Sequence, residues 1–536
     1  MRLLKKTLIL LIVIFSILIV GCARGENSDA GNQKSAAKEE LILAVGNEPE
    51  TGFDPALGWG QYGSPLFQST LLKRDRDLNI TYDAATSYEV SDDGKVWTVK
   101  LRDDVMFSDG KPLRAEDVQF TFETALSSGS VLDLNILETV VVKDPTTVEF
   151  HLRNANSTFI HSLLTLGIIP KHSYGDEYAE NPVGSGPYKL VQWDKGQQII
   201  IEMNPNYYGE KPFFKRITFL FLNEDAAYAA AKAGQVDVAY IPASFSKNKV
   251  SGMRLKDVQS VDNRGIMFPY VPSGEKTKDG EPIGNDVTAD IAIRKAINFA
   301  IDRQALVDGV LEGYGTPGYS VADGLPWSNE ETKIKDGDLK SAKEILAKAN
   351  WKDQNGDGLL EKDGLRAEFD LLYPASDVTR QSLAIAVADM MTPLGIKINV
   401  EGKSWDEIES LMHSSAVIMG WGSHDPLEIY NLFGGKMAGI DYYNSGFYSN
   451  SKVDEYLDKA LLSKSEEEAI EYWKKAQWDG ETGFSTLGDA PWAWLVNIDH
   501  LYLVNEKLNI GEQKIEPHAH GWPITDNLVD WKWDEQ

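Results

Sequence analysis

Three histidines stand in two short segments, each of which also contains glycine and tryptophan. His518 and His520 are one residue apart just before Trp522, and His424 follows Trp421 by three positions. Alternate side chains of an extended chain point the same way, so the imidazoles of His518 and His520 can reach one ion. Neutral imidazole is a common ligand of Ni²⁺, Cu²⁺ and Zn²⁺. Because the chain has only eight histidines, this grouping favours a transition metal such as Ni²⁺, free or as a small chelate, as the bound solute. Imidazoles in a mobile loop or packed on Trp522 are the alternative.

The segment around His424 carries further groups that can contact a solute. Ser423 and Asp425 offer a hydroxyl and a carboxylate beside the indole of Trp421. Flat aromatic side chains line many solute clefts, and a few polar groups then fix the orientation of the solute. We therefore predict ligand contacts from Trp421, Ser423, Asp425 and Trp522, with His424, His518 and His520 as the metal ligands.

A second pattern of oxygen-bearing side chains resembles the start of a calcium-binding loop. Asp353, Asn355 and Asp357 alternate along the chain, Glu361 follows, and Gly358 suits a sharp turn. The twelfth position of the loop is glycine instead of the bidentate glutamate of an EF-hand, which excludes a full EF-hand. A lesser structural Ca²⁺ site at Asp353, Asn355, Asp357 and Glu361 is one interpretation, and a solvated hairpin turn without an ion is the other.

The chain carries none of the common catalytic motifs. It has no G-x-S-x-G, H-E-x-x-H or phosphate-binding loop pattern. Ser423, His424 and Asp425 are consecutive, so their side chains diverge and cannot form a catalytic triad with one another. We expect a binding protein that is not an enzyme and that requires no cofactor.

The N-terminus has the order of charges and apolar residues that is typical of a bacterial export signal. Three basic residues precede the apolar run Leu8–Val20, which is shorter than the ~20 residues of a membrane-spanning helix. The run ends at Gly21 and Cys22, and residues 19–22 resemble a lipobox. Cys22 is the only cysteine, so we predict that it is lipidated after cleavage of a signal peptide at 1–21. Residues 22–39 have the composition of a flexible tether.

Composition narrows the class of protein further. The chain has 536 residues and a formal net charge of −28, which disfavours nucleic acid as a partner. About 500 residues after the tether are too many for one core and suit two lobes. Strand patterns at 41–45, 96–101, 147–152 and 396–400 interleave with helical patterns at 293–310, 339–349 and 382–391, which predicts an α/β protein. Asp338 is a suitable N-cap for the helix at 339–349.

Several short motifs, taken in order, resemble the family 5 extracellular solute-binding proteins, the peptide and nickel binders of bacterial ABC importers. The motifs are VMFSDG at 105–110 with Pro112, Ala115, Asp117 and Val118; GSGPY at 184–188; NPNYY at 204–208; GQVD at 234–237; and RKAIN at 294–298 with AIDR at 300–303. Each motif is short, but their order and spacing extend from about residue 40 to the 520s. Their residue types suit turns and packing surfaces, so we expect these motifs to be structural.

The resemblance implies a two-lobed clamshell of the periplasmic-binding-protein type that closes on its ligand by hinge motion. Mapped onto this chain, lobe 1 comprises 40–75, 183–265 and 495–536, a subdomain of lobe 1 comprises 76–182, and lobe 2 comprises 266–494. The implied partners are a permease and separate ATPase subunits. We expect a monomer anchored by lipid to the outer face of the cytoplasmic membrane.

The same resemblance implies an alternative ligand. In the peptide-binding branch, a longer segment between the tryptophan and the Asp-Pro pair carries an acid that pairs with the amino terminus of the peptide. Here residues 422–424 are all that separate Trp421 from Asp425 and Pro426. This shortening weakens the peptide interpretation, although Asp425 can still serve as the acid. A third interpretation is an adhesin or chaperone-like lipoprotein on the same fold.

Overall fold

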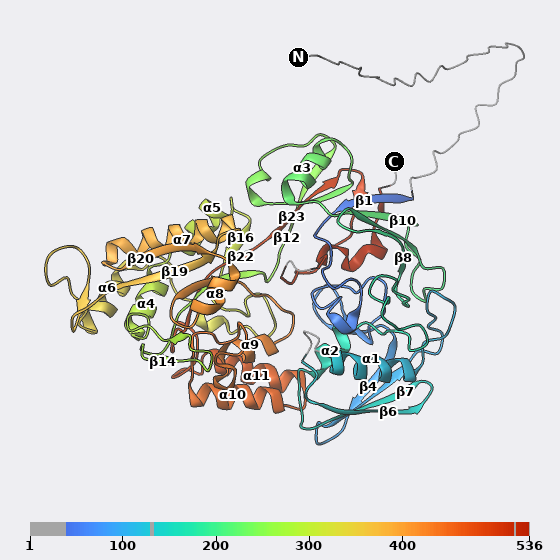
Figure 1. Ribbon diagram of the computed structural model, residues 1–536, viewed down its shortest axis with the longest axis horizontal. Coiled ribbons are helices and arrows are strands. Elements are labelled where there is room, and N and C mark those ends of the chain that lie inside the picture. Colours follow the sequence, from blue (N-terminus) through green and yellow to red (C-terminus); the bar gives the residue numbers. More distant parts are fainter. Residues whose placement is uncertain (1–38, 129–132, 519–520, 535–536) are drawn as a thin grey trace, which may run out of the picture. The chain divides into compact units, whose positions relative to one another are not determined.

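The computed structural model describes residues 39–128, 133–518 and 521–534 (Figure 1). Residues 1–38 and 39–536 separate into two units, and the second carries the secondary structure reported below. The predicted signal peptide, Cys22 and His520 lie outside the described residues, as does the tether except for residue 39. Among the described residues, no helix is long and apolar enough to cross a bilayer.

A seven-stranded sheet collects strands from the two ends and the middle of the chain. In spatial order the strands are β12 (Met253–Val258), β23 (His500–Asn505), β11 (Val238–Ile241), β1 (Glu40–Ala44), β10 (Arg216–Leu220), β9 (Gln198–Met203) and β8 (Tyr188–Asp194). β1 runs parallel to β10 and β11, and the other neighbours are antiparallel. Helix α3 (Glu224–Lys232) packs on β11, and the side chain of Asn223 accepts a hydrogen bond from Ala226 N at its first turn.

A six-stranded sheet forms the centre of a second hydrophobic core. Its order is β16 (Gly315–Pro317), β22 (Trp492–Ile498), β13 (Asn263–Met267), β21 (Ala416–Met419), β19 (Glu368–Pro374) and β20 (Lys397–Lys403). Helix α7 (Val378–Met391) packs on β19 and β20, while α4 (Ile291–Ala300) and α5 (Arg303–Val310) contact β22 (Figure 1). Helix α6 (Leu339–Lys348) packs on α4, and its N-cap is Asp338, as predicted.

The expectation of one helix over 293–310 is wrong, because the structure has two helices there. Ile301 has extended backbone angles (φ −61°, ψ 126°), and Asp302 caps α5 by accepting a hydrogen bond from Ala305 N. Arg294 and Arg303 are each 1% exposed and donate to backbone carbonyl groups of the 489–494 segment. The RKAIN and AIDR motifs are therefore packing elements of this core.

A four-stranded antiparallel sheet belongs to residues 85–152. Its order is β4 (Ala85–Val90), β5 (Val96–Leu101), β7 (Thr147–Leu152) and β6 (Leu137–Asp144). The two strands predicted at 96–101 and 147–152 are confirmed as antiparallel neighbours. Helix α1 (Ala115–Ser128) packs on β6 and β7, and α2 (Phe159–Thr165) contacts β2 (Leu72–Arg74).

The GSGPY motif passes close to another part of the backbone. A Cβ atom on Gly184 would lie 2.0 Å from the carbonyl oxygen of Phe67. Only glycine permits this approach. The motif therefore has a structural role.

The remaining elements are short strands and helices around the three sheets. The strands are β3 (Ile80–Tyr82), β14 (Glu275–Lys276), β15 (Pro282–Ile283), β17 (Glu361–Lys362), β18 (Leu365–Arg366), β24 (Leu508–Asn509) and β25 (Lys532–Trp533). The helices are α8 (Trp405–Leu411), α9 (Leu427–Phe433), α10 (Ser451–Leu462) and α11 (Glu466–Gln477).

The chain passes directly between the two larger sheets at two places. Residues 259–262 connect β12 of the seven-stranded sheet to β13 of the six-stranded sheet, and residue 499 connects β22 to β23. Ile498 N donates to Asp262 O at 2.8 Å, and Ser260 Oγ donates to Ile498 O at 2.5 Å. These hydrogen bonds hold the two crossings side by side.

The segment before α2 contacts the last turn of α10. Ser157 N donates to Leu461 O, and Ser157 Oγ donates to Ala460 O, both at 2.8 Å. The last carbonyl groups of a helix lack partners within the helix. Ser157 therefore supplies two donors to α10 from a distant part of the sequence. Nearby, Arg74 Nη2 lies 3.7 Å from a carboxylate oxygen of Glu466.

We expect Ser157→Ala to lower the free energy of unfolding by about 1 kcal/mol, because it removes the Oγ hydrogen bond to α10. Ser127→Ala is the matched control, since the Ser127 hydroxyl donates only within α1, to Thr124 O. We expect the control to change stability by less than about 0.5 kcal/mol. Urea denaturation followed by circular dichroism measures both values, and equal effects would contradict the assignment.

Candidate functional site

The segment around Trp421 follows strand β21 directly and lies beside the crossing between the sheets. Asn263 at the start of β13 holds the backbone of Trp421 from both sides: its N–H donates to Trp421 O at 2.9 Å, and its Oδ1 accepts from Trp421 N at 3.1 Å. Gly422 has a φ of +150°, and a Cβ there would lie 2.6 Å from Val261 O. The chain then turns through Pro426 into α9. We refer to residues 420–428 as the Trp421 turn.

Two carboxylates of the Trp421 turn are half-buried. Asp425 accepts a hydrogen bond from Leu427 N at 2.9 Å. Glu428 accepts from Gly422 N and Ser423 N, each at 3.2 Å. Burial raises the pKa of each carboxyl group to about 7, although these hydrogen bonds oppose the shift.

Other segments bring basic side chains to Asp425. His161 Nε2 of α2 lies 3.8 Å from Asp425 Oδ1, and Arg74 Nη2 lies 3.4 Å from His161 Nδ1. Burial lowers the pKa of His161 well below its usual value, and the charge of Arg74 lowers it further. His161 is therefore neutral, and the positive charge beside Asp425 comes from Arg74, which opposes the rise in the pKa of Asp425.

His424 is a neutral imidazole in the same turn. Burial lowers its pKa to about 3, and the charges of Lys514 and Arg74 act in the same direction. Its Nε2 atom is buried and has no hydrogen-bond partner among the described residues. Such a nitrogen has the chemistry of a single metal ligand.

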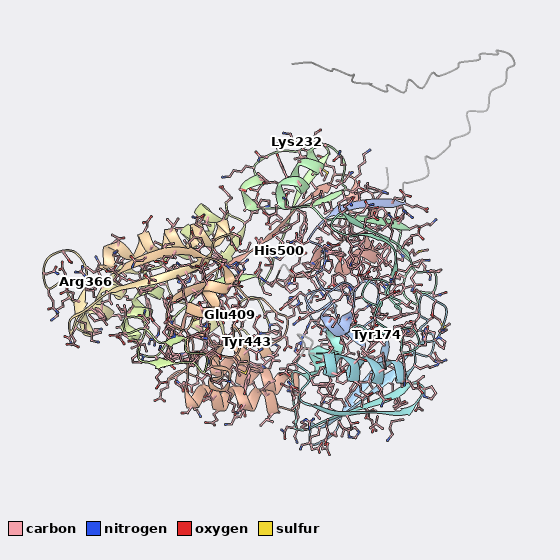
Figure 2. The ribbon with its side chains drawn as sticks, in the orientation of Figure 1. Tyr174, Lys232, Arg366, Glu409, Tyr443 and His500 are labelled. Atoms are coloured by element: carbon pink, nitrogen blue, oxygen red, sulfur yellow. The ribbon has the colours of Figure 1, made fainter. Side chains whose placement is uncertain are left out.

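Aromatic rings border the turn. Trp421 stacks on Tyr443, which Figure 2 labels, with ring centroids 5.6 Å apart and an interplanar angle of 28°. The ring of Tyr62 lies 6.5 Å from that of His518. Burial raises the pKa of Tyr62, and the negative charge of Glu428 adds to the shift. Burial and the charge of Asp441 raise the pKa of Tyr443, and the charge of Glu428 also raises it.

A buried charge network occupies the crossings themselves. Asp262 contacts Arg264 and His518 Nδ1 at short distance, and His500 Nε2 lies 3.4 Å from its Oδ2. His500, labelled in Figure 2, also bonds Glu516 through Nδ1 at 2.6 Å. Burial alone would lower the pKa of His500, but hydrogen bonds to Asp262 and Glu516 outweigh it and raise the pKa to about 9. Burial opposes ionisation of Asp262 as well, yet Arg264 and the two histidines hold its pKa well below the usual value.

The structure brings some of the predicted site residues together and separates others. His518 N donates to Gly422 O at 2.7 Å, so the C-terminal segment lies against the Trp421 turn, as the sequence interpretation requires. Trp522 is 4% exposed, stacks on Phe219 at 4.6 Å and donates from Nε1 to Asn47 O. Its indole is thus part of the core beside the seven-stranded sheet.

At neither of the two predicted metal sites do the described residues form a set of ligands around one ion. In the ranges 39–128, 133–518 and 521–534, no group of three or more His, Cys, Asp or Glu side chains is placed to hold an ion. His520 is outside these ranges. In the calcium-like loop, Asp353 accepts from Gly356 N and Gly358 N, Asn355 donates to Asp357 and Glu361, and Arg366 pairs with Asp357 at 2.8 Å. Both sites stay predictions.

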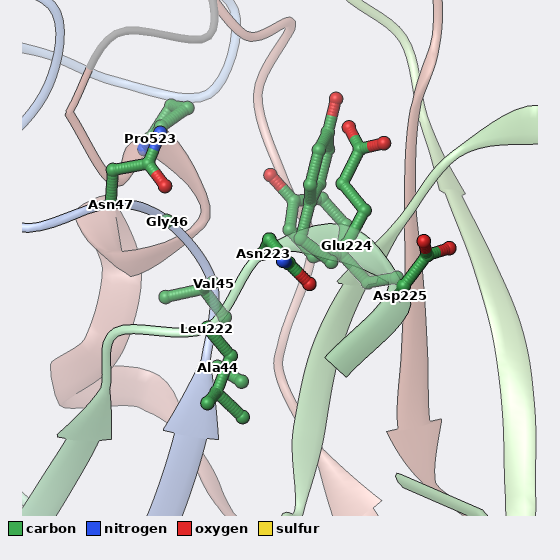
Figure 3. A pocket seen from close by; sticks show the side chains of 11 residues that line it. Ala44, Val45, Gly46, Asn47, Leu222, Asn223, Glu224, Asp225 and Pro523 are labelled. Carbon is green, nitrogen blue, oxygen red and sulfur yellow. The ribbon is translucent and has the colours of Figure 1, made fainter. Parts of the chain in front are cut away.

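A pocket of about 520 Å³ opens at the carboxyl ends of β1 and β10 (Figure 3). Its lining includes Gly46, Asn47, Asn223, Glu224, Tyr240 and Tyr502. Ligands of open α/β sheets bind outside the carboxyl ends of parallel strands. Tyr502 also donates to Glu516 at 3.0 Å, which connects the pocket wall to the charge network at the crossings.

The sequence interpretation missed several residues of this region. Arg380, near the start of α7, has a buried Nε without a hydrogen-bond partner among the described residues, and the same holds for Arg264. Burial and the charge of Arg264 lower the pKa of Arg380 to about 10. No motif marks Arg74, His161, Arg264, Arg380 or Glu428. The one available signal was that Glu428 falls in the first turn of a helix that begins just after Pro426, where acidic residues are common.

These features define a class of protein: two sheets joined by paired crossings, with charged and aromatic side chains gathered where the crossings meet. The sequence matches the model for bacterial extracellular solute-binding proteins, family 5, over residues 79–441. The chain belongs to this family, and the α/β, two-lobed fold of the periplasmic binding proteins is confirmed.

Relatives and a solved structure agree with this assignment. The chain is 33% identical to protein XP55 of Streptomyces lividans, over 90% of this chain and 87% of the relative. It is 28% identical to the oligopeptide-binding protein AppA of Bacillus subtilis, over 87% of this chain and 90% of the relative. It is similar to the crystal structure of NikZ from Campylobacter jejuni in complex with Ni(L-His), with a TM-score of 0.76, 27% identity and coverage of 92% of this chain and 99% of the other. Relatives thus include both peptide-binding and nickel-binding proteins.

The charge network predicts a pH dependence of stability. The folded pKa of His500, about 9, is above its unfolded value of 6.5. The folded state therefore binds this proton more tightly than the unfolded state does. The contribution of His500 to the free energy of unfolding is fully present below pH 6.5 and is lost as the pH rises through 9. The loss approaches about 3 kcal/mol. We expect His500→Gln to flatten the decline of the free energy of unfolding between pH 6.5 and 9, measured by urea denaturation. His151→Gln, on the exposed side of β7, should keep the slope of the unchanged chain.

Proposed function

We propose that the protein is the solute-capturing subunit of a peptide/nickel-type ABC importer and that its solute is small and charged. Membership of the family supports the first part of the proposal. The carboxylates of the Trp421 turn, close to the aromatic rings of Trp421 and Tyr443, support the second. In this proposal the two lobes close around this region. Lobe 1 comprises 40–75, 183–265 and 495–536 with the subdomain 76–182, and lobe 2 comprises 266–494. The permease takes up the solute from the closed form.

The observation that supports this class of solute is the burial and the raised pKa of the Asp425 and Glu428 carboxyl groups. Asp425 and Glu428 are half-buried and have pKa values of about 7, so a solute that brings positive charge stabilises their ionised forms. Arg380, which pairs with Asp377 at 2.7 Å, adds a guanidinium group to this region, and the charge of Asp262 acts on both Arg380 and Glu428. This combination favours a solute with an amino group and a carboxylate, as a short peptide has.

A nickel chelate is the second candidate, and His424 is the observation that favours it. Its Nε2 is buried without a hydrogen-bond partner in the described part of the chain. One imidazole can complete the coordination of an ion whose other ligands come from a small chelator such as free histidine. His518 and His520 remain candidates for the same role.

Native mass spectrometry and calorimetry separate the two candidates. We expect the protein to bind short peptides with free termini, and to bind Ni²⁺ with L-histidine more tightly than Ni²⁺ alone if the chelate is the solute. Recovery of the solute unchanged after incubation agrees with binding without catalysis. A protein that binds no peptide, no nickel species and no co-purified solute would contradict the proposed function.

His424→Ala tests the metal role directly. If the chelate is the solute, loss of the one imidazole ligand should weaken binding of Ni²⁺ with L-histidine at least about 10- to 100-fold, because even the loss of an outer-shell partner of a metal ligand costs this much. His151→Ala is the control for removing an imidazole elsewhere. Unchanged nickel affinity in His424→Ala would exclude His424, and the double variant of His518 and His520 would then test the other pair.

We also propose that Cys22 carries a lipid and that the binding unit is held at the outer face of the cytoplasmic membrane. The lipobox-like residues 19–22 and the single cysteine support this proposal. Cys22→Ser should move the protein from the membrane fraction to the soluble fraction. Equal distributions of the two forms would contradict lipid anchoring.

A further inference from the structure

A group of contacts beside the Trp421 turn joins the two ranges that are proposed as lobes. On one side are Arg74 of β2, in lobe 1, and Leu78, Ser157 and His161, in the subdomain 76–182. Their partners lie in 266–494, the range proposed for lobe 2. We refer to these contacts as the clasp, because they join the lobes separately from the two chain crossings.

The polar part of the clasp lies at the end of α10. Ser157 N donates to Leu461 O and Ser157 Oγ donates to Ala460 O, both at 2.8 Å. These carbonyl groups are in the last turn of the helix, where the regular hydrogen bonds of the helix end. Both donors leave α10 if the subdomain and lobe 2 separate, so the two hydrogen bonds exist only while these parts touch.

The apolar part of the clasp is Leu78, in the turn between β2 and β3. Asp75 shapes this turn, because its Oδ1 accepts from Asp77 N and Asn79 N, each at 2.9 Å. Leu78 has a φ of +64°, in the left-handed region that leucine rarely adopts. It is 8% exposed and belongs to an apolar cluster whose other buried members among the described residues, Val261 excepted, lie in 266–494. Burial of Leu78 in this cluster favours contact between the lobes.

Arg74 joins the polar and apolar parts. Its Nη1 donates to Leu78 O at 2.6 Å, which holds the guanidinium group beside the turn. Its Nη2 lies 3.7 Å from Glu466 Oε1 at the start of α11. The side chain of Glu466 is 40% exposed, so water screens this ion pair. The pair therefore contributes less to the clasp than the burial of Leu78 does.

His161 extends the clasp to the candidate solute site. Its Nδ1 lies 3.4 Å from Arg74 Nη2, and its Nε2 lies 3.8 Å from Asp425 Oδ1 of the Trp421 turn. Its ring meets that of Trp327 edge to face, with centroids 6.3 Å apart. Separation of the lobes at the clasp therefore moves His161 away from the Trp421 turn.

We propose that the clasp holds the lobes in the closed form, and that opening requires Leu78 to leave the lobe 2 cluster and Ser157 to leave α10. The proposal rests on the hinge closure that the proposed function includes. Since only one of two conformations binds tightly, the clasp sets the fraction of molecules in that conformation. It therefore changes the affinity for every solute by the same factor, whatever the chemistry of the solute.

The test removes the clasp and measures the separation of the lobes. The double variant Leu78→Ala with Ser157→Ala loses the apolar side chain and one of the two hydrogen bonds to α10. We expect it to raise the ratio of open to closed molecules at least about 10-fold, because the burial of the leucine side chain is lost. Leu126→Ala with Ser127→Ala changes the same residue types in α1, where Leu126 is 38% exposed. This matched control should leave the ratio unchanged.

Single-molecule fluorescence transfer measures the ratio in the full chain carrying Cys22→Ser. The dyes are attached at Glu123→Cys in α1 of the subdomain and at Glu344→Cys in α6 of lobe 2, both of which are exposed positions. No solute is added, so the result does not depend on which solute the protein binds. Opening of the lobes appears as a second population with a different transfer efficiency.

The outcomes separate the clasp from the proposed function. Equal populations in the unchanged chain and the double variant, or an equal shift in the control, would overturn the clasp alone. A chain that opens as expected but binds no peptide, nickel species or co-purified solute would contradict the proposed function alone. Circular dichroism confirms that each variant is folded. If Leu78→Ala does not fold, Ser157→Ala with Glu466→Gln removes only polar contacts and should raise the ratio by a smaller factor, and no rise would overturn the clasp.

Discussion

The carboxylate of Asp262 is the group on which the rest of the architecture depends. It lies in the chain crossing between β12 and β13, and it contacts Arg264 after the crossing, His500 at the start of β23 and His518 near the C-terminus. A buried ionised carboxylate is stable only with such partners. Because His518 N also bonds Gly422 O, the position of Asp262 determines where the two crossings, the C-terminal segment and the Trp421 turn lie.

This arrangement joins the Trp421 turn to the crossings through electrostatics. Asp262 is one of the charges that raise the pKa of Glu428, so the two carboxylates repel each other when both are ionised. Since the partners of Asp262 come from both sides of the crossings, the charge of Glu428 acts on the same network that connects the sheets.

Much of the fold follows from local patterns in the sequence. The alternating strands at 96–101 and 147–152 and the Asp338 cap appear as expected, because period-two burial and side-chain capping are local properties. The break between α4 and α5 was missed although Asp302 is a good N-cap, since the apolar spacing of 293–310 continues across it. The sheets themselves, which combine residues 40–44 with 500–505, depend on pairings that no local pattern specifies.

The site was predictable only in part, for the same physical reason. Residue types at 421–425 and 518 identified the turn and the C-terminal segment, and the structure places them in contact. The electrostatic setting of each carboxylate could not be read from those types. That depends on Arg74 and His161, which stand far away in sequence and reach Asp425 only through the packing of β2 and α2. Asp425 and Glu428 both accept hydrogen bonds from backbone N–H groups, and the charge of Arg74 acts on Asp425, so the electrostatic character of the site is a product of tertiary structure.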